Sequence, residues 1–301
     1  MPTIAEQLQQ IATIKANIKA AIEAKGETVG SDAFATYPTH IANISGGGGG
    51  GSDLDDFVKN TLETLTIPSG VTKVRDYLCY GQNFLKSVTI PSGVTAIGVA
   101  AFQNCTGLTS ITIPSGVTAI PNDMCNGAQN IASITLPSGI LTFGSNCFKN
   151  VKYITSLTFP DSTTTLGNYM FDGCSRLQRI VYPPLVKTIA TQINYNNTAL
   201  QYIEIGAQVT AINNNAFNGC KAVTTIVCRA TTPPTVQSAT FGNGTSNYTG
   251  RTTYNSGVNK LYVPQGCSSA YNTSYWASVL LDSSKCGFTI AELDANGNIP
   301  T

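Results

Sequence analysis

The chain has 301 residues, and its 17 Lys and Arg residues nearly balance its 16 Asp and Glu residues, leaving a formal net charge of +1 at pH 7. This balance gives no reason to expect a nucleic-acid partner or an anionic membrane surface as the partner. No run of about 18 apolar residues occurs, so the sequence predicts no membrane insertion. The first residues carry no basic segment followed by an apolar run, so no secretory signal is expected in the sequence as written.

Residues 1–45 predict a helical module for attachment or oligomerisation. Thr3 and Glu6 have the spacing of a capping box at a helix start, and Gly26 provides a stop. The residues between them follow the a/d pattern of a coiled coil, with a lysine at one a position. The seam consists of Ile4, Leu8, Ile11, Lys15, Ile18 and Ile22.

Two arrangements of this module remain open. The helix can fold back on a second short helix within residues 31–44, or it can pair with other copies in a coiled coil. A homotrimer is among the assemblies considered, although three heptads are short for an independent coiled coil. Residues 46–53 follow as a Gly-rich linker, which decouples the module from the rest of the chain.

The same module resembles a known kind of protein. The stretches IAEQLQQI at residues 4–11 and FATYPTHIANI at residues 34–44 resemble the start of tail or baseplate-associated proteins of phages and prophages of gut bacteria. In such proteins a short module, a Gly-rich joint and a variable distal domain follow one another. The resemblance implies that residues 1–45 bind other virion or surface proteins.

Residues 54–235 carry a repeat over about eight coils. The motif Ile67-Pro68-Ser69-Gly70-Val71 returns every 23 residues without insertion, which is typical of a solenoid. The first residues of its copies are Ile67, Ile90, Ile113, Leu136, Phe159, Tyr182, Ile205 and Cys228.

Each copy predicts one short strand and one turn. Apolar residues such as Leu65 and Ile67 alternate with polar ones, which is the pattern of a strand with one buried face. Proline then ends the strand, because it cannot donate to the hydrogen-bond ladder. The sequence of residues 67–70 suits a type I turn with Pro68 in the second position. Stacked copies predict a mainly β solenoid with one continuous parallel sheet.

The repeat also resembles a known family. The template Leu-x-x-Ile-x-Ile-Pro-x-x-Val-x-x-Ile-x-x-x-x-Phe-x-x-Cys, in register over residues 62–228, resembles the BspA-type leucine-rich repeat of surface proteins of bacteria, protists and some phages. The resemblance implies adhesion and ligand binding as the common uses. It implies no shared catalytic residues.

The chain has nine cysteines, and seven of them lie in the repeats. Cys79 and Cys125 occupy a position at which other coils carry Phe102 or Phe171, so buried free thiols are favoured over a disulfide or metal framework. Cys267 and Cys286, outside the repeats, are the one pair considered for a disulfide. No CxxC pair occurs and there is a single histidine, so neither a metal site nor a cofactor is expected.

Candidate ligand-binding residues appear where the repeats diverge. The outward strand positions are Ser or Thr in the first coils, and they then become Arg179, Tyr202 and Glu204. Arginine and tyrosine side chains each contribute strongly to binding energy at interfaces. Arg179, Tyr202 and the charged Glu204 are therefore candidates for ligand binding. Ordinary drift of the repeat is the competing interpretation.

Residues 236–301 predict a long loop followed by a C-terminal strand and helix. The loop is rich in Gly, Asn, Thr and Tyr, a composition found in adaptable binding surfaces, and Tyr248, Arg251 and Tyr254 are further candidates. Residues 261–263 predict a strand, and Ser268 or Ser269 predicts the cap of a helix that covers the last coil. Residues 294–298 are interpreted as a turn, because the Gly comes too early for a calcium loop.

These observations leave three functional hypotheses. The first is a non-enzymatic, virion-borne phage-tail protein that presents the solenoid to a host-surface protein or glycan. The second is a secreted or cell-surface bacterial adhesin, and the third is a purely structural virion component. An enzyme is not expected, because no nucleophile and base are arranged around the single histidine.

Overall fold

The structure is a computed structural model, and it describes residues 63–237, 239–242, 259–281 and 287–300. The chain divides into two units, Met1–Asn60 and Thr61–Thr301, and the description concerns the second. The predicted helical seam, the Gly-rich linker and the candidates Tyr248, Arg251 and Tyr254 lie outside the described residues. So do the predicted boundaries of the N-terminal module, which stay predictions.

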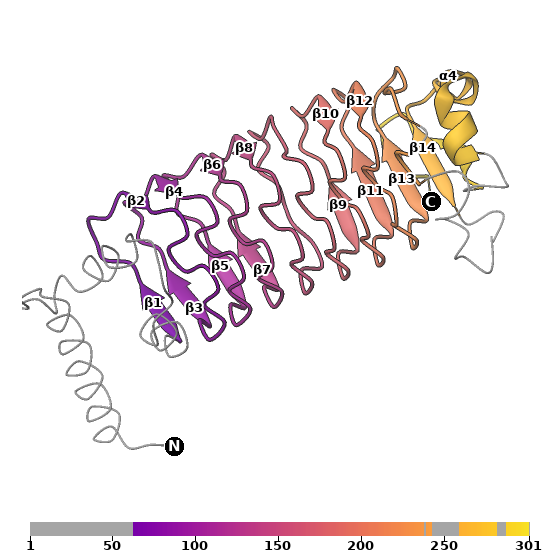
Figure 1. Ribbon diagram of the computed structural model, residues 1–301. Coiled ribbons are helices and arrows are strands. Elements are labelled where there is room, and N and C mark those ends of the chain that lie inside the picture. Colours follow the sequence, from indigo (N-terminus) through magenta and orange to yellow (C-terminus); the bar gives the residue numbers. More distant parts are fainter. Residues whose placement is uncertain (1–62, 238, 243–258, 282–286, 301) are drawn as a thin grey trace, which may run out of the picture. The chain divides into compact units, whose positions relative to one another are not determined.

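The second unit is a β-solenoid, as the 23-residue period predicted (Figure 1). Residues one period apart lie side by side, as Thr64 does with Ser87, and all strand pairings described are parallel. The main strands are β1 (Thr64–Thr66), β3 (Ser87–Thr89), β5 (Ser110–Thr112), β7 (Ser133–Thr135), β9 (Arg179–Val181), β11 (Tyr202–Ile205), β13 (Thr225–Cys228), β14 (Lys260–Val263) and β15 (Thr289–Glu292).

Six of the coils described also have a second, two-residue strand after the turn. It carries a residue that points into the core, such as Val74, which is 2% exposed. These strands are β2 (Lys73–Val74), β4 (Ala96–Ile97), β6 (Ala119–Ile120), β8 (Thr142–Phe143), β10 (Thr188–Ile189) and β12 (Ala211–Ile212). The described residues contain the helix α4 (Ser268–Thr273) and the π-helical turn η2 (Ala277–Leu281).

The prediction of one continuous sheet over eight coils is wrong. The main strands form the pairs β1-β3 and β5-β7 and a five-stranded sheet in the order β15-β14-β13-β11-β9. The solenoid has about seven parallel coils. Residues 156–158 occupy the next strand position after β7 but form no strand. Here Phe159 and Tyr182 replace the usual Ile. Their rings stack with centroids 6.5 Å apart, wider than the about 4.8 Å between paired strands.

The proline turn is displaced by one residue from the predicted position. The N–H of Val71 donates to the carbonyl of Pro68 at 3.3 Å, so proline is the first residue of the turn rather than the second. Gly70 then lies at the third position with φ of 94°, a conformation that glycine adopts without strain. The chain turns after each strand, as expected.

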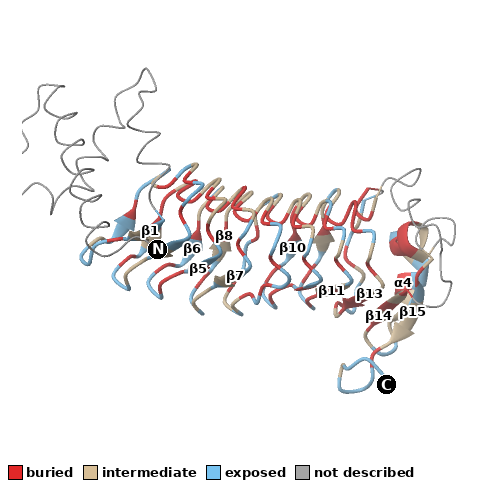
Figure 2. Ribbon diagram, turned by 90° about the horizontal axis from the view of Figure 1, so that it is seen from below, coloured by how far each residue is buried: buried red, intermediate tan, exposed pale blue. Residues whose placement is uncertain are grey.

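Apolar residues fill the inside of the coils along the whole solenoid (Figure 2). The residues at the Phe/Cys position, among them Phe102, Cys125 and Phe171, are completely buried. The seven cysteines of the repeats are free and buried, which confirms their interpretation as small apolar residues. Cys267 is also free, whereas Cys286 lies outside the described residues, so their pairing stays a prediction.

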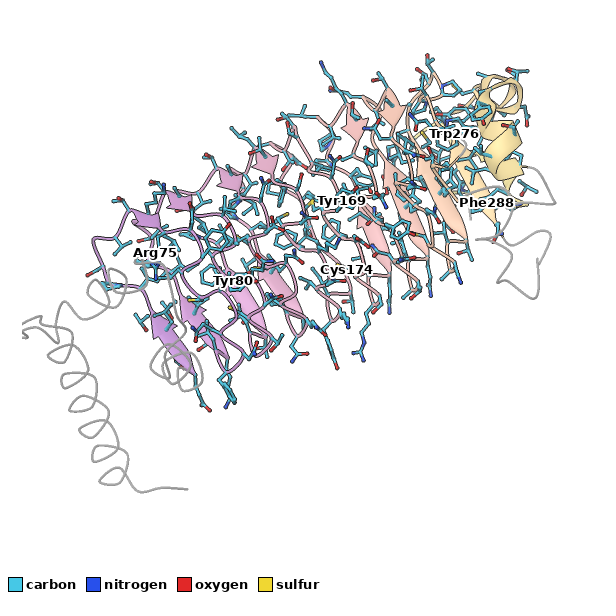
Figure 3. The ribbon with its side chains drawn as sticks, in the orientation of Figure 1. Arg75, Tyr80, Tyr169, Cys174, Trp276 and Phe288 are labelled. Carbon is cyan, nitrogen blue, oxygen red and sulfur yellow. The ribbon has the colours of Figure 1, made fainter. Side chains whose placement is uncertain are left out.

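The C-terminal segment covers the end of the solenoid (Figures 1 and 3). The predicted strand is confirmed as β14, and β15 adds beyond it. Tyr271 of α4 donates to the carbonyl of Ala230 at 2.7 Å, and Trp276 Nε1 donates to that of Pro234 at 2.7 Å. Both rings are buried, so this segment closes the apolar interior.

The predicted serine cap of the helix is wrong. The residue before the helix is Cys267, which makes no side-chain capping bond. Instead, Glu292 of β15 accepts hydrogen bonds from the backbone N–H and the hydroxyl of Ser268, at 3.3 and 2.7 Å. A carboxylate from a neighbouring strand therefore satisfies the helix start, a contact that local sequence does not reveal.

Candidate functional site: the outer face of the C-terminal sheet

The outer face of the five-stranded sheet gathers the predicted residues of the strands. Parallel register places Tyr202 of β11 beside Arg179 of β9 on one side and Thr225 of β13 on the other. Side chains two residues apart share a face of a strand, so Glu204 lies on the same face as Tyr202. Of the six candidates, the structure therefore brings together Arg179, Tyr202 and Glu204.

Arg179 stacks on the ring of Tyr202. Its guanidinium carbon lies 3.6 Å from the ring centroid, which is close contact for a cation–π pair. The Arg179 side chain remains 51% exposed. The stack holds the planar guanidinium in one orientation, while its outer edge can still donate hydrogen bonds to a ligand.

Glu204 is the centre of this cluster. The hydroxyl of Tyr202 donates to its Oε2 at 2.7 Å, and Arg229 Nε donates to its Oε1 at 2.6 Å. Arg179 adds a longer contact to Oε2 at 3.4 Å. Because both carboxylate oxygens have internal partners, Glu204 fixes the other side chains in place, and its direct contact with a ligand stays a prediction.

The electrostatics of the cluster follow from these contacts. Partial burial raises the pKa of Glu204, but the hydrogen bonds from Tyr202 and Arg229 and the two guanidinium charges outweigh burial and lower it. Burial and the hydrogen bond to Glu204 raise the pKa of the Tyr202 hydroxyl. At neutral pH the cluster therefore consists of two cations, one carboxylate and a protonated phenol, with one positive charge in excess.

Sequence reasoning missed Arg229. It occupies the position at which the first copies carry Pro68 or Pro91, so the lost proline was a signal in the sequence. Besides binding Glu204, Arg229 donates from NH1 to the carbonyl of Gly297 at 2.8 Å. That carbonyl belongs to the predicted turn at residues 294–298, which is confirmed by the hydrogen bond from the Asp294 N–H to the Asn298 carbonyl at 2.9 Å. Arg229 thus ties the C-terminal turn to the cluster.

The outer face of the first coils has a different character. Its strand positions expose hydroxyls, and Ser87 donates to Thr64 Oγ1 at 3.3 Å. Lys86 and Glu63 form an exposed pair at 2.8 Å, of a kind that contributes little to stability. Of these two outer faces, the one on the C-terminal sheet carries the cluster of stacked and charged side chains.

The described ranges hold no group of three His, Cys, Asp or Glu side chains arranged to bind a metal ion. Among the same residues, none of the helices has both the length and the apolar character needed to span a bilayer.

Fold and face together define a leucine-rich repeat solenoid with a polar, arginine- and tyrosine-bearing sheet surface. The sequence model of the BspA type Leucine rich repeat region matches residues 55–155 and 142–278 in six copies, so the chain belongs to this family. The matched ranges begin at residue 55, and the resemblance of residues 1–45 to phage tail proteins stays a prediction. A search of curated proteins found no match.

Solved structures share the fold. A Treponema pallidum leucine-rich repeat protein is 24% identical, with a TM-score of 0.50, over 55% of this chain and 78% of its own. A leucine-rich repeat protein from Bacteroides ovatus is 18% identical, with a TM-score of 0.50, over 77% of this chain and 69% of its own. These likenesses support the solenoid and carry nothing further about its ligand.

Proposed function

We propose that this protein is a non-enzymatic adhesin, exposed outside the cell, that binds a host-surface ligand through the outer face of β9, β11 and β13. The observation that carries the proposal is the Arg179–Tyr202 stack, an exposed guanidinium held on an aromatic ring. Membership in the BspA-type family supports it, because adhesion is the use implied by the family resemblance. A fixed pair of this kind loses little conformational entropy on binding.

The test is binding of the full chain, fluorescently labelled, to two kinds of cell. Cultured epithelial monolayers represent an animal host surface, and a panel of intact gut bacteria represents the surface that a phage protein would meet. The proposal expects saturable binding to the epithelial cells. It also expects that Arg179→Ala with Tyr202→Ala reduces this binding by about tenfold or more, the loss of a central pair of contacts.

The matched control is Thr64→Ala with Ser87→Ala, which alters the paired outward positions of β1 and β3 that correspond to Arg179 and Tyr202. This control should bind as the original protein does, and circular dichroism should show the same folded signal for all variants. Saturable binding to bacteria alone would overturn the adhesin in favour of the phage-tail role. Absence of saturable binding to both cell types would leave a structural role.

A further inference from the structure

The break in the sheet creates an open groove of about 470 Å³ between β7 and residues 156–160. Its volume falls within the range of about 300–1,000 Å³ typical of small-ligand sites. The groove lies where the strand after β7 is lost.

The walls of the groove are rows of hydroxyls. Ser133 and Thr135 line one side and Ser156 and Thr158 the other, and all four are exposed. No backbone hydrogen bond joins residues 156–158 to β7 or β9, so main-chain polar groups add to the side-chain hydroxyls. Leu136, which is half-buried, supplies apolar surface at one end. Rows of donors and acceptors over an apolar patch fit the hydroxyls and the C–H faces of a sugar chain.

Two exposed cations lie close to this groove. Arg176 stacks on the ring of Tyr153 with its guanidinium carbon 4.1 Å from the centroid, and the Tyr153 side chain is 43% exposed. Tyr153 precedes Ser156 by three residues, so their Cα atoms are at most about 11 Å apart. Lys152 precedes Tyr153 in the chain. Within the described part of the chain, neither Arg176 nor Lys152 has an acidic side chain at ion-pairing distance.

We infer that this groove, together with Lys152, Tyr153 and Arg176, is a second binding site that takes an acidic oligosaccharide. The hydroxyl walls bind sugar hydroxyls, the Tyr153 ring offers a face for a pyranose ring, and Arg176 and Lys152 bind the carboxylate or sulfate groups. The inference stands apart from cell adhesion, because it concerns other residues and is tested with purified sugars.

A peptide strand fits this groove less well. Strand addition needs an open sheet edge, whereas this gap has a coil on each side. The two coils are tied together on their other side, where Thr164 N–H donates to the Leu141 carbonyl and Asn146 N–H to that of Asn168, both at 2.9 Å. An inserted peptide strand would require the two coils to move apart by one more inter-strand distance. The hydrogen bonds on the other side prevent this separation.

The experiment measures binding of the full chain to size-defined heparin and hyaluronan oligosaccharides by calorimetry. The neutral probe is a dextran oligosaccharide of similar length, and a poly-glutamate peptide is the acidic non-sugar probe. We expect at least one of the acidic oligosaccharides to bind, and we expect dextran and the peptide to bind more weakly. Tyr153→Ala with Arg176→Gln should weaken the affinity for the acidic oligosaccharide by about tenfold or more.

The chain offers a matched control in Arg75→Gln with Tyr80→Ala, which changes an exposed arginine and an exposed tyrosine on the first described coils (Figure 3). This control should stay within about twofold of the original affinity, because surface changes away from a site have small effects. A second variant, Ser156→Val with Thr158→Val, removes the hydroxyls of one wall and should also weaken binding.

Four results would overturn the inference. They are no binding of either acidic sugar, equal binding of dextran, equal binding of poly-glutamate, and an equal loss in the Arg75 and Tyr80 control. Melting curves that match the original protein establish that the variants are folded. Loss of epithelial-cell binding in the Arg179 and Tyr202 variant leaves this result unaffected, so the two proposals fail separately.

Discussion

Gly127 leaves room for the side chain of Asn104 in the preceding coil. A Cβ atom at Gly127 would lie 2.1 Å from Asn104 Oδ1, and Gly127 itself has φ of 76°. The same pairing recurs two repeats further along the chain, where a Cβ atom at Gly173 would lie 2.4 Å from Asn150 Oδ1. Asparagine and glycine therefore alternate along this ladder, and the packing unit of the solenoid is two coils.

The first prediction separates steric fit from backbone strain at this ladder. Gly81 has φ of 73° but nothing within 4 Å of a built Cβ, so Gly81→Ala should cost about 1–2 kcal/mol for the left-handed conformation alone. Gly127→Ala should cost that amount plus about 1–3 kcal/mol for the clash with Asn104. Chemical unfolding of both variants measures the difference.

A third variant makes the test specific. Asn104→Gly in the Gly127→Ala background removes the clashing side chain, and it should recover most of the additional loss. The two substitutions would then show a clear interaction energy, as expected for residues in contact. Equal destabilisation by Gly81→Ala and Gly127→Ala would rule out the proposed fit.

The second prediction concerns the thiols. Burial raises the pKa of Cys79 to about 12, against a smaller opposing effect of the Arg75 charge, and burial raises that of Cys228 to about 11. The seven buried cysteines should therefore not react with dithionitrobenzoate in the folded protein near neutral pH. Cys267, which is partly exposed, should react.

The variant Cys286→Ser simplifies this measurement, because it removes the one cysteine outside the described residues. It should show one fast thiol when folded, and Cys267→Ser in addition should remove that signal. Unfolding in guanidinium should then release the seven remaining thiols. A fast reaction of several thiols before unfolding would contradict the buried ladder.

Parts of this architecture could be predicted from the sequence and parts could not. The meeting of Arg179 and Tyr202 followed from their shared place in the period, because parallel register aligns equal positions. The contact of Arg229 with Glu204 joins different positions of the repeat, so the period could not reveal it. The sheet break was hidden because residues 156–158 keep the local pattern of a strand although they form none.

The third prediction addresses a polar layer in the core. Asn194 occupies a position where neighbouring coils carry Phe171 and Phe217, and its Nδ2 donates to the hydroxyl of buried Tyr182. Asn197 Nδ2 in turn donates to Asn194 Oδ1 at 3.1 Å. Tyr182→Phe would leave the Asn194 amide without its acceptor, so it should cost about 1–3 kcal/mol of unfolding free energy.

Tyr80→Phe is the matched control, because Tyr80 is 45% exposed. Chemical unfolding of the two variants should show a clear loss for Tyr182→Phe and almost none for Tyr80→Phe. If both variants unfold at the same denaturant concentration, the hydrogen bond to Asn194 contributes no stability to the core.

The fourth prediction is the pH dependence of the surface cluster. The folded-state pKa of Glu204 lies below its ordinary value of 4.5. A carboxyl group with a lowered pKa contributes stability that is fully present above the unfolded value and is lost as the pH falls through the folded value. Glu204→Gln should therefore lower the melting temperature near neutral pH, and the difference from the original protein should shrink as the pH falls below about 4.5.

Glu63→Gln provides the comparison for this measurement. Glu63 pairs with Lys86 at 2.8 Å, but the two side chains are 62% and 63% exposed, and such pairs contribute little. Its removal should change the melting temperature only slightly at any pH. A Glu204→Gln difference that stays constant from neutral to acidic pH would show that the loss does not depend on ionisation of Glu204. In that case the negative charge of Glu204 would not be what holds Arg179 and Arg229 in place.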